Sequence, residues 1–346
     1  MKTMRFTVHT VPPAVKALVV VLALSVTGPA FSQTPPVLQN LLDDVDSFTD
    51  RIADSLPLNA SIGLNWASAY IGQLTSVPPH FGVGIAVGVS TIKAEALSGI
   101  IDKFGGGALP FKAVFPNPGY TAEARIGGFI LPFDIGIKAG YLPPVPLSDV
   151  EFNYFLVGGD VRYALIKDRI APAVSVGVGV NYLKGGIKVG LPEQTFSGTA
   201  TVSGTDQSFT LKLQDPTLGF EWETLMCEVK AQVSKSFILF TPYAGLGINY
   251  SKTTAGLKAE TTPVISVTSG TAPTNDQIGA AYGITLDSQG FSRIRTLEGF
   301  GARVFGGVAF TIAVIRLDFT AFAATGTNFN FGGMNYGGSI GVRFQL

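Results

Sequence analysis

The stretch 173–184 alternates between two kinds of side chain with a period of two. Val174, Val176, Val178, Val180 and Tyr182 occupy one set of positions, and Ser175, Gly177, Gly179 and Asn181 occupy the other. This period is that of a β-strand, in which successive side chains point to opposite faces. The outward face of a soluble strand normally carries Lys, Glu and Thr. Branched apolar residues opposite small polar ones predict a transmembrane barrel strand whose outer face meets lipid.

Ten segments share this pattern and are joined by turns. They are 81–90, 120–130, 133–142, 150–166, 171–188, 221–234, 240–252, 293–310, 314–324 and 331–346. Such a series predicts an all-β fold, an antiparallel meander closed into a transmembrane barrel. The segment 61–71 also alternates, and it leaves a twelve-strand barrel open.

The lengths of the connections predict an orientation. Tight turns fall near residues 131, 168, 236 and 312, and the long connections are 93–118, 189–217 and 258–290. Outer-membrane barrels place short turns in the periplasm and long loops outside. Ten strands put every tight turn on one side and both chain ends in the periplasm, and the Thr/Ser/Gly-rich loops are expected to extend as hairpins.

Composition agrees with a barrel. Charged residues make up 14 % of the 346 residues, hydrophobic residues make up 46 %, and 42 are glycine, which is too apolar and glycine-rich for a typical soluble surface. No segment after residue 32 offers about 18 uninterrupted apolar residues, which disfavours a helical membrane protein. The formal net charge of zero gives no nucleic-acid footprint.

The N-terminal region predicts export. Residues 1–32 combine Lys2, Arg5 and Lys16 with an apolar run and the small-x-small sequence Ala-Phe-Ser, as in a cleaved signal peptide. An uncleaved anchor helix is the alternative. Residues 33–78 form an N-terminal helical segment, with apolar residues recurring at three and four over 36–56. It is expected to plug the barrel, lie in the periplasm or bind a partner; residues 79–346 form the barrel.

Charged residues of the strands are expected to face the lumen, because a charge at the bilayer midplane costs about 2–4 kcal/mol for Arg or Lys. The predicted lumen residues are Glu123, Arg125, Asp134, Lys138, Asp160, Arg162, Glu228, Lys230, Arg303, Arg316, Asp318 and Arg343. Two interpretations follow: an ion-paired network that locks a narrow barrel, or a constriction that selects permeants by charge. Two-residue spacing of opposite charges favours the network, with pairing inside one strand or to the next.

The outward face is expected to be aromatic near the strand ends. Girdle candidates are Tyr141, Tyr163, Tyr182, Tyr250, Tyr336 and Phe344. Cys227, the one cysteine, falls on the lipid side as an apolar filler, so no internal disulfide is expected.

Catalysis and metal binding are disfavoured by the residue inventory. The chain has two histidines, His9 in the predicted signal peptide and His80 at a strand start. A multi-histidine metal site is therefore not expected, and a Ser-His-acid site would depend on His80 alone. No cofactor is expected, and we expect a protein that is not an enzyme.

The C-terminal strand resembles the assembly signal of Gram-negative-type outer-membrane barrels through Tyr336, Ile340, Val342, Phe344 and Leu346. With the signal peptide and glycine-rich strands, the chain resembles uncharacterised outer-membrane barrel proteins of spirochaetes, some of which are likened to long-chain fatty-acid transporters. The resemblance implies location in the cell outer membrane, with lipid, the barrel-assembly machinery and periplasmic chaperones as partners.

Two functions are expected from these features of the sequence. The first is a passive porin-like channel or uptake protein for small molecules, apolar ones included, with the N-terminal helix and the segment 93–118 as plug or gate. The second is a structural or surface-exposed adhesin or antigen whose lumen is closed by side chains. The sequence names no permeant and no oligomeric state.

Overall fold

The computed structural model describes residues 36–93, 114–147, 150–190, 194–202, 205–267 and 291–346. The predicted signal peptide, 1–32, lies outside the described residues.

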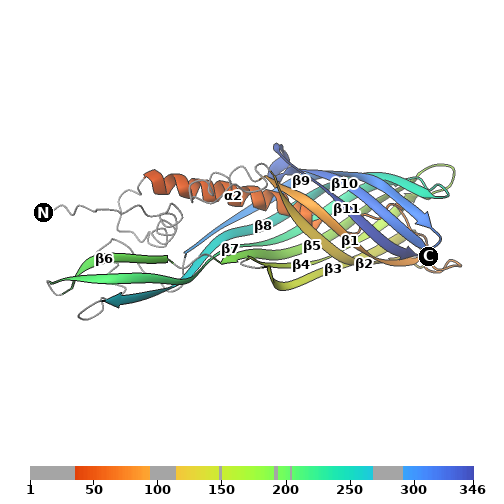
Figure 1. The fold of residues 1–346 in the computed structure, drawn as a ribbon. Helices are drawn as coiled ribbons and strands as arrows, with labels where there is room; N and C mark the ends of the chain where they lie inside the picture. The colour runs from red at the N-terminus through yellow and green to blue at the C-terminus, as the bar shows by residue number, and fades with distance from the viewer. Residues whose placement is uncertain (1–35, 94–113, 148–149, 191–193, 203–204, 268–290) are drawn as a thin grey trace.

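Ten long strands close into one antiparallel barrel (Figure 1). They are β1 (Phe81–Lys93), β2 (Val114–Gly127), β3 (Phe133–Leu147), β4 (Val150–Ile166), β5 (Ala173–Gly190), β7 (Thr205–Ser234), β8 (Phe240–Val267), β9 (Phe291–Ile312), β10 (Ile315–Gly326) and β11 (Asn330–Gln345). Each pairs with the next, β1 pairs with β11, and pairing of β5 with β7 completes the ring. The prediction of about ten strands is confirmed, and the twelve-strand alternative is wrong.

The alternation sorts the two faces as a transmembrane barrel requires. On β5, Val176, Val178 and Val180 are exposed on the outside, whereas Ser175 and Asn181 are buried inside. The hydrocarbon layer holds no water to bond free peptide groups. A closed ring of strands, like an α-helix, satisfies its backbone hydrogen bonds without water. No helix among the described residues is long and apolar enough to cross a bilayer.

We call the end of the barrel opposite the tight turns the loop end. Helix α2 (Pro36–Ala60) begins outside the loop end and runs into the barrel (Figure 1). Its contacts follow the strands downward: Asp50 binds Arg295 near the loop end, and Asn59 binds the Asn117 carbonyl farther in. After α2 the chain is irregular, and the Ile71 amide reaches Asp134 next to the tight turns. Residues 48–72, called here the lumen segment, therefore run through the whole barrel.

This path corrects two expectations. The segment 61–71 is buried inside the barrel and does not form a strand of the wall. The expectation of both chain ends at the tight turns holds for the barrel itself, since Leu346 donates its amide to the Phe81 carbonyl. The expectation is wrong for α2, which begins at the opposite end of the barrel. From there the lumen segment crosses the barrel to the tight turns, where β1 begins.

At the loop end the sheet continues past the barrel. The short strand β6 (Gln194–Val202) pairs with the first part of β7, and β8 pairs with β7 up to Val267. These three strands form a narrow extension beyond the mouth (Figure 1). The hairpin expected in the connection 189–217 is thus present, built from longer strands than the sequence pattern predicted.

Candidate functional site

The lumen has a polar half near the tight turns. All twelve predicted lumen residues point inward; eleven are buried, and Arg316 is half-buried. They come from strands on all sides of the barrel, so burial brings together charges that are far apart in sequence.

The carboxylates in this half bind cations on other strands. Asp134 of β3 binds Arg125 of β2 at 2.5 Å and Arg162 of β4 at 2.9 Å. Asp160 of β4 binds Arg125 at 2.6 Å and Lys230 of β7 at 2.7 Å. In this half of the lumen, opposite charges thus pair across strands.

Two further ion pairs extend the network around the barrel. Arg303 of β9 makes a bidentate pair with Glu228 of β7 at 2.8 and 2.9 Å, and Arg343 of β11 binds Asp318 of β10 at 2.5 Å. Bidentate Arg–carboxylate geometry fixes direction as well as distance. Of the five carboxylates among the predicted lumen residues, all except Glu123 are therefore paired with a strand cation.

Glu123 and Lys138 instead hold the backbone of the lumen segment. Glu123 accepts hydrogen bonds from the Leu64 amide at 2.8 Å and the Trp66 indole at 2.6 Å. Lys138 donates to the Ala60 and Ile62 carbonyls at 2.7 and 2.6 Å. A buried irregular backbone needs such partners, because its peptide groups would otherwise be left unsatisfied.

Further strand residues continue this pattern toward the tight turns. Gln232 donates to the Trp66 and Ala67 carbonyls, and Ser234 accepts from the Ala69 amide. The Arg162 guanidinium donates to the Ser68 carbonyl. The lumen segment is thus bonded to the wall residue by residue.

Inward glycines make room for this segment. A Cβ at Gly82 would lie 2.8 Å from the Trp66 ring, and one at Gly119 would lie 2.9 Å from Ile62. Two small voids, of about 10 and 20 Å³, lie beside the part of the lumen segment that is inside the barrel. Each is close to the size of one water molecule. The described lumen is closed.

The half of the lumen nearer the loops is apolar. The apolar face of α2 packs there on inward residues of β4, β5 and β7, and Phe48 meets Phe220 edge-on with ring centroids 5.6 Å apart. This apolar cluster consists of Phe48, Ile52, Ala53, Leu56, Ala60, Ile92, Tyr154, Leu156, Leu183, Phe220, Trp222 and Ala255. Barrel interiors are usually polar, so an apolar half of the lumen distinguishes this chain.

The wall beside the apolar cluster has a seam between β2 and β3. Their ladder covers Ala122–Gly127 and stops at the Ala122–Ala139 pair, although both strands continue toward the loops. No described residue pairs with β2 on this side beyond that point. Proline, which lacks the amide hydrogen that a ladder needs, occupies five positions of the two edges: Pro116, Pro118, Pro143, Pro144 and Pro146.

Aromatic side chains lie at the base of the seam. The Tyr120 hydroxyl of β2 donates to the Tyr141 carbonyl of β3, and the Tyr120 ring stacks on Tyr154 at 5.6 Å. Tyr120 and Leu142, one from each edge, both pack against the apolar cluster. The seam therefore lies directly beside the apolar half of the lumen.

A separate cleft of about 530 Å³ lies between α2 and the rim of β9 and β11. Asp46, Asp50, Arg51 and Asp54 line its helix side. Most of its lining residues are charged or polar, unlike those of the apolar cluster beside the seam.

The residues that were predicted to face outward lie on the outer wall of the barrel. Tyr141, Tyr163, Tyr250, Tyr336 and Phe344 are exposed there, and Tyr182 is half-buried. Cys227 is a free, exposed thiol on the same face. In the C-terminal strand, Ile340 and Val342 also point outward, whereas Leu346 is half-buried at the tight-turn end.

His80 lies at the tight-turn end with its Nδ1 3.2 Å from the Leu346 carbonyl oxygen. Within the described ranges, no group of three or more His, Cys, Asp or Glu side chains could hold a metal ion.

The apolar cluster was not predicted from the sequence. A signal was present, because alternation fails along 152–157, where apolar residues occupy both faces of the strand. The prolines of the seam were visible as well, but the pattern alone assigned 143–149 to a connection.

Comparisons with known proteins add fold-level likeness only. No protein-family model and no curated protein matches the chain. Among solved structures, the outer membrane protease OmpT from Escherichia coli shares 9 % identity at a TM-score of 0.39, covering 80 % of this chain and 100 % of its own. A Pseudomonas aeruginosa FadL homologue shares 9 % identity (TM-score 0.25, 77 % and 90 % covered). The Ralstonia pickettii toluene transporter TbuX shares 8 % (TM-score 0.22, 77 % and 88 %).

Proposed function

We propose that this chain is an outer-membrane uptake protein for small apolar molecules, with the lumen segment as its plug. The observation that carries the proposal is the apolar cluster inside the barrel, which lies beside the seam in the wall. An inner surface of Phe, Trp, Tyr and Leu binds apolar molecules by the same burial that now holds α2.

The position of the seam supports this function. It begins at the level of Tyr141, which packs on Phe155, and Phe155 packs on Tyr182 in the same outward row. Such aromatic rows mark the membrane interface. Unpaired strand edges are excluded from the hydrocarbon layer but tolerated where water reaches them, so the seam opens where apolar molecules leave the outer leaflet.

The closed lumen makes an open passive channel the less favoured form of the function. Passage to the periplasm requires movement of the plug, because the voids beside it are too small for a solute. The proposal is not enzymatic. We further propose that the signal peptide is cleaved and that the chain lies in the cell outer membrane, like the spirochaete proteins that it resembles. Its partners there would be lipid, the barrel-assembly machinery and periplasmic chaperones.

The chain offers a direct test because it has two tryptophans, Trp66 and Trp222. Trp222 belongs to the apolar cluster, whereas Trp66 lies in the polar half, where Arg343 is 4.6 Å from its ring. Trp66→Phe and Trp222→Phe each leave one reporter. In nanodiscs, a brominated alkane is expected to quench Trp222 saturably, and the unbrominated alkane should reverse the quenching.

The Trp222→Phe variant is the matched control, and Trp66 should be quenched little. Weak, non-saturating quenching of both reporters would mean partition into the bilayer alone and would contradict the proposal. Tyr120→Phe, which removes the hydroxyl bridge across the seam, should speed the quenching of Trp222 without changing its final extent.

A surface-exposed protein with a closed lumen is the second candidate, favoured by the extension of β6, β7 and β8 beyond the mouth. If recognition by this extension is the function, deletion of 194–213 should abolish binding of whole cells to their target surface. Alkane quenching of Trp222 should then be absent in the intact chain as well.

A further inference from the structure

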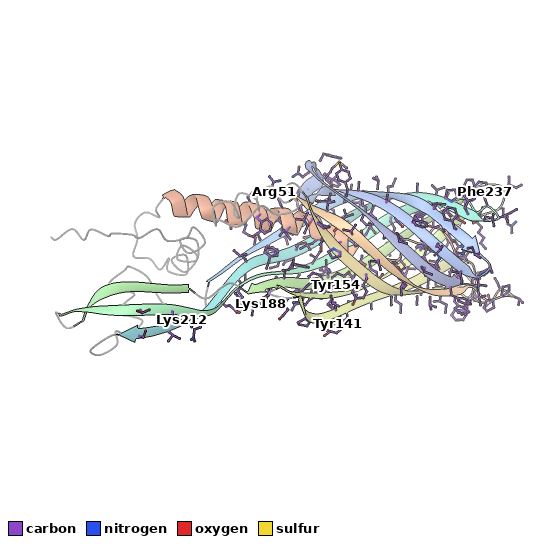
Figure 2. All side chains as sticks on the ribbon, viewed as in Figure 1. Arg51, Tyr141, Tyr154, Lys188, Lys212 and Phe237 are labelled. Atoms are coloured by element: carbon purple, nitrogen blue, oxygen red, sulfur yellow. The ribbon has the colours of Figure 1, made fainter. Side chains whose placement is uncertain are left out.

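The tight turns carry exposed apolar side chains at their tips. Ile130 in the β2–β3 turn is 85 % exposed, Ile170 in the β4–β5 turn is 101 % exposed, and Ile238 in the β7–β8 turn is 95 % exposed. Phe237 marks this end of the molecule, opposite Lys212 in the extension (Figure 2). The turn rim, as we call it, consists of Phe129, Ile130, Leu131, Ile170, Phe237, Ile238, Leu239 and Ile312.

Turns that face water are built mainly from Gly, Asn, Asp, Ser and Pro. Here the sequence Phe-Ile-Leu occurs in two of the four turns, at 129–131 and 237–239. Exposed apolar surface of this extent marks a binding surface. The turn rim is also continuous with the outward wall, because Phe237 stacks on Phe240, the first residue of β8, with centroids 4.8 Å apart.

The height of the wall indicates what covers the turn rim. On β5 and β7 the outward apolar runs span Val174 to Tyr182 and Leu225 to Val233, and the cross-strand pair Lys184 and Glu223 bounds both on the loop side. Eight residues rise about 26 Å along a strand. At a tilt of about 40° this covers about 20 Å of depth, less than the apolar band of about 25 Å. The apolar side chains at the turn tips extend the apolar wall toward the full depth of this band.

The charges of the four turns suit a phospholipid surface. They are Lys167, Asp168, Arg169 and Lys235, and Asp168 is already engaged by Lys235 at 2.9 Å and by the Ser236 amide at 2.8 Å. The side chains of Lys167 and Arg169 remain exposed next to Ile170. A net positive charge beside apolar tips is the arrangement of an interfacial membrane anchor for anionic lipid.

We propose that the turn rim inserts into the phospholipid leaflet on the tight-turn side, with Lys167 and Arg169 at the phosphate level of anionic lipids. The rim thereby fixes the depth of the barrel in the membrane. This inference goes beyond the uptake function and does not depend on any permeant.

Spin-label depth measurements test the insertion. In a Cys227→Ala background, nitroxides are attached in turn at Ile130→Cys, Ile170→Cys and Ile238→Cys, and the barrels are reconstituted in nanodiscs. Each label should be more accessible to oxygen than to a water-soluble nickel chelate, as should a label at Val229→Cys on the wall. A label at Lys188→Cys, near the loop end, should show the reverse. Heat-modifiable gel mobility confirms that each barrel is folded.

If the three rim labels behave like the Lys188 label, the turns lie in water and the proposal is wrong; a soluble protein partner would then be the remaining occupant. The charge assignment has its own readout. The label at Ile170 should lie deeper in nanodiscs that contain phosphatidylglycerol than in phosphatidylcholine alone, and Lys167→Gln with Arg169→Gln should abolish the difference. Equal depth in both lipids for the unaltered turn would overturn the anionic-lipid contact.

Discussion

At the scale of single residues, Asp134 joins the wall to the lumen segment. Its carboxylate is buried, binds Arg125 and Arg162, and accepts a hydrogen bond from the Ile71 amide at 3.2 Å. The sequence could place this aspartate inward, because alternation with a period of two determines the face. It could not supply the partners, since these depend on strand register and on the path of a segment outside the sheet.

Asp134→Asn should therefore destabilise the barrel by about 3–5 kcal/mol, because it leaves two buried guanidinium groups without their shared anion. The midpoint of urea unfolding in liposomes measures the loss. Asp168→Asn is the matched control: its pair with Lys235 is partly exposed, and loss of a surface ion pair costs about 0–1 kcal/mol. Equal shifts in the two variants would show that Asp134 does not hold the polar half together.

At the scale of elements, the sequence pattern predicted helix α2 but not the surface on which it packs. Spacing of three and four predicted a helix over 36–56, and the helix spans Pro36–Ala60. The same spacing identifies an apolar face but not the surface that it meets, so the plug, periplasmic and partner-binding positions stayed open. The surface is the apolar cluster, whose inward residues interrupt the alternation of their own strands.

The path of α2 predicts where the chain emerges. An epitope tag inserted directly before Pro36 should be bound by antibody on intact cells, because α2 begins at the loop end and loops face outward. A tag inserted in the β4–β5 turn after Asp168 should be bound only after the outer membrane is permeabilised. Protection of the first tag in intact cells, with the second exposed, would reverse the orientation of the barrel.

At the scale of the whole molecule, the ten-strand barrel follows from one repeated pattern together with the order of short and long connections. Lipid outside and a filled lumen inside impose that pattern on every strand, so local sequence carries it. The seam and the closed lumen arise from non-local packing. In particular, Gly82 and Gly119 leave space that is filled by Trp66 and Ile62, residues of a segment that the strand pattern alone cannot place.

Conductance in planar bilayers tests the central claim, that residues 48–72 close an otherwise open barrel. The intact chain should be silent without a permeant, and so should a variant lacking 37–47, which keeps the lumen filled. A variant lacking 37–72, shown to be folded by heat-modifiable mobility, should give stepwise ion currents. Open-channel currents from the intact chain, or silence from the folded 37–72 deletion, would contradict this account.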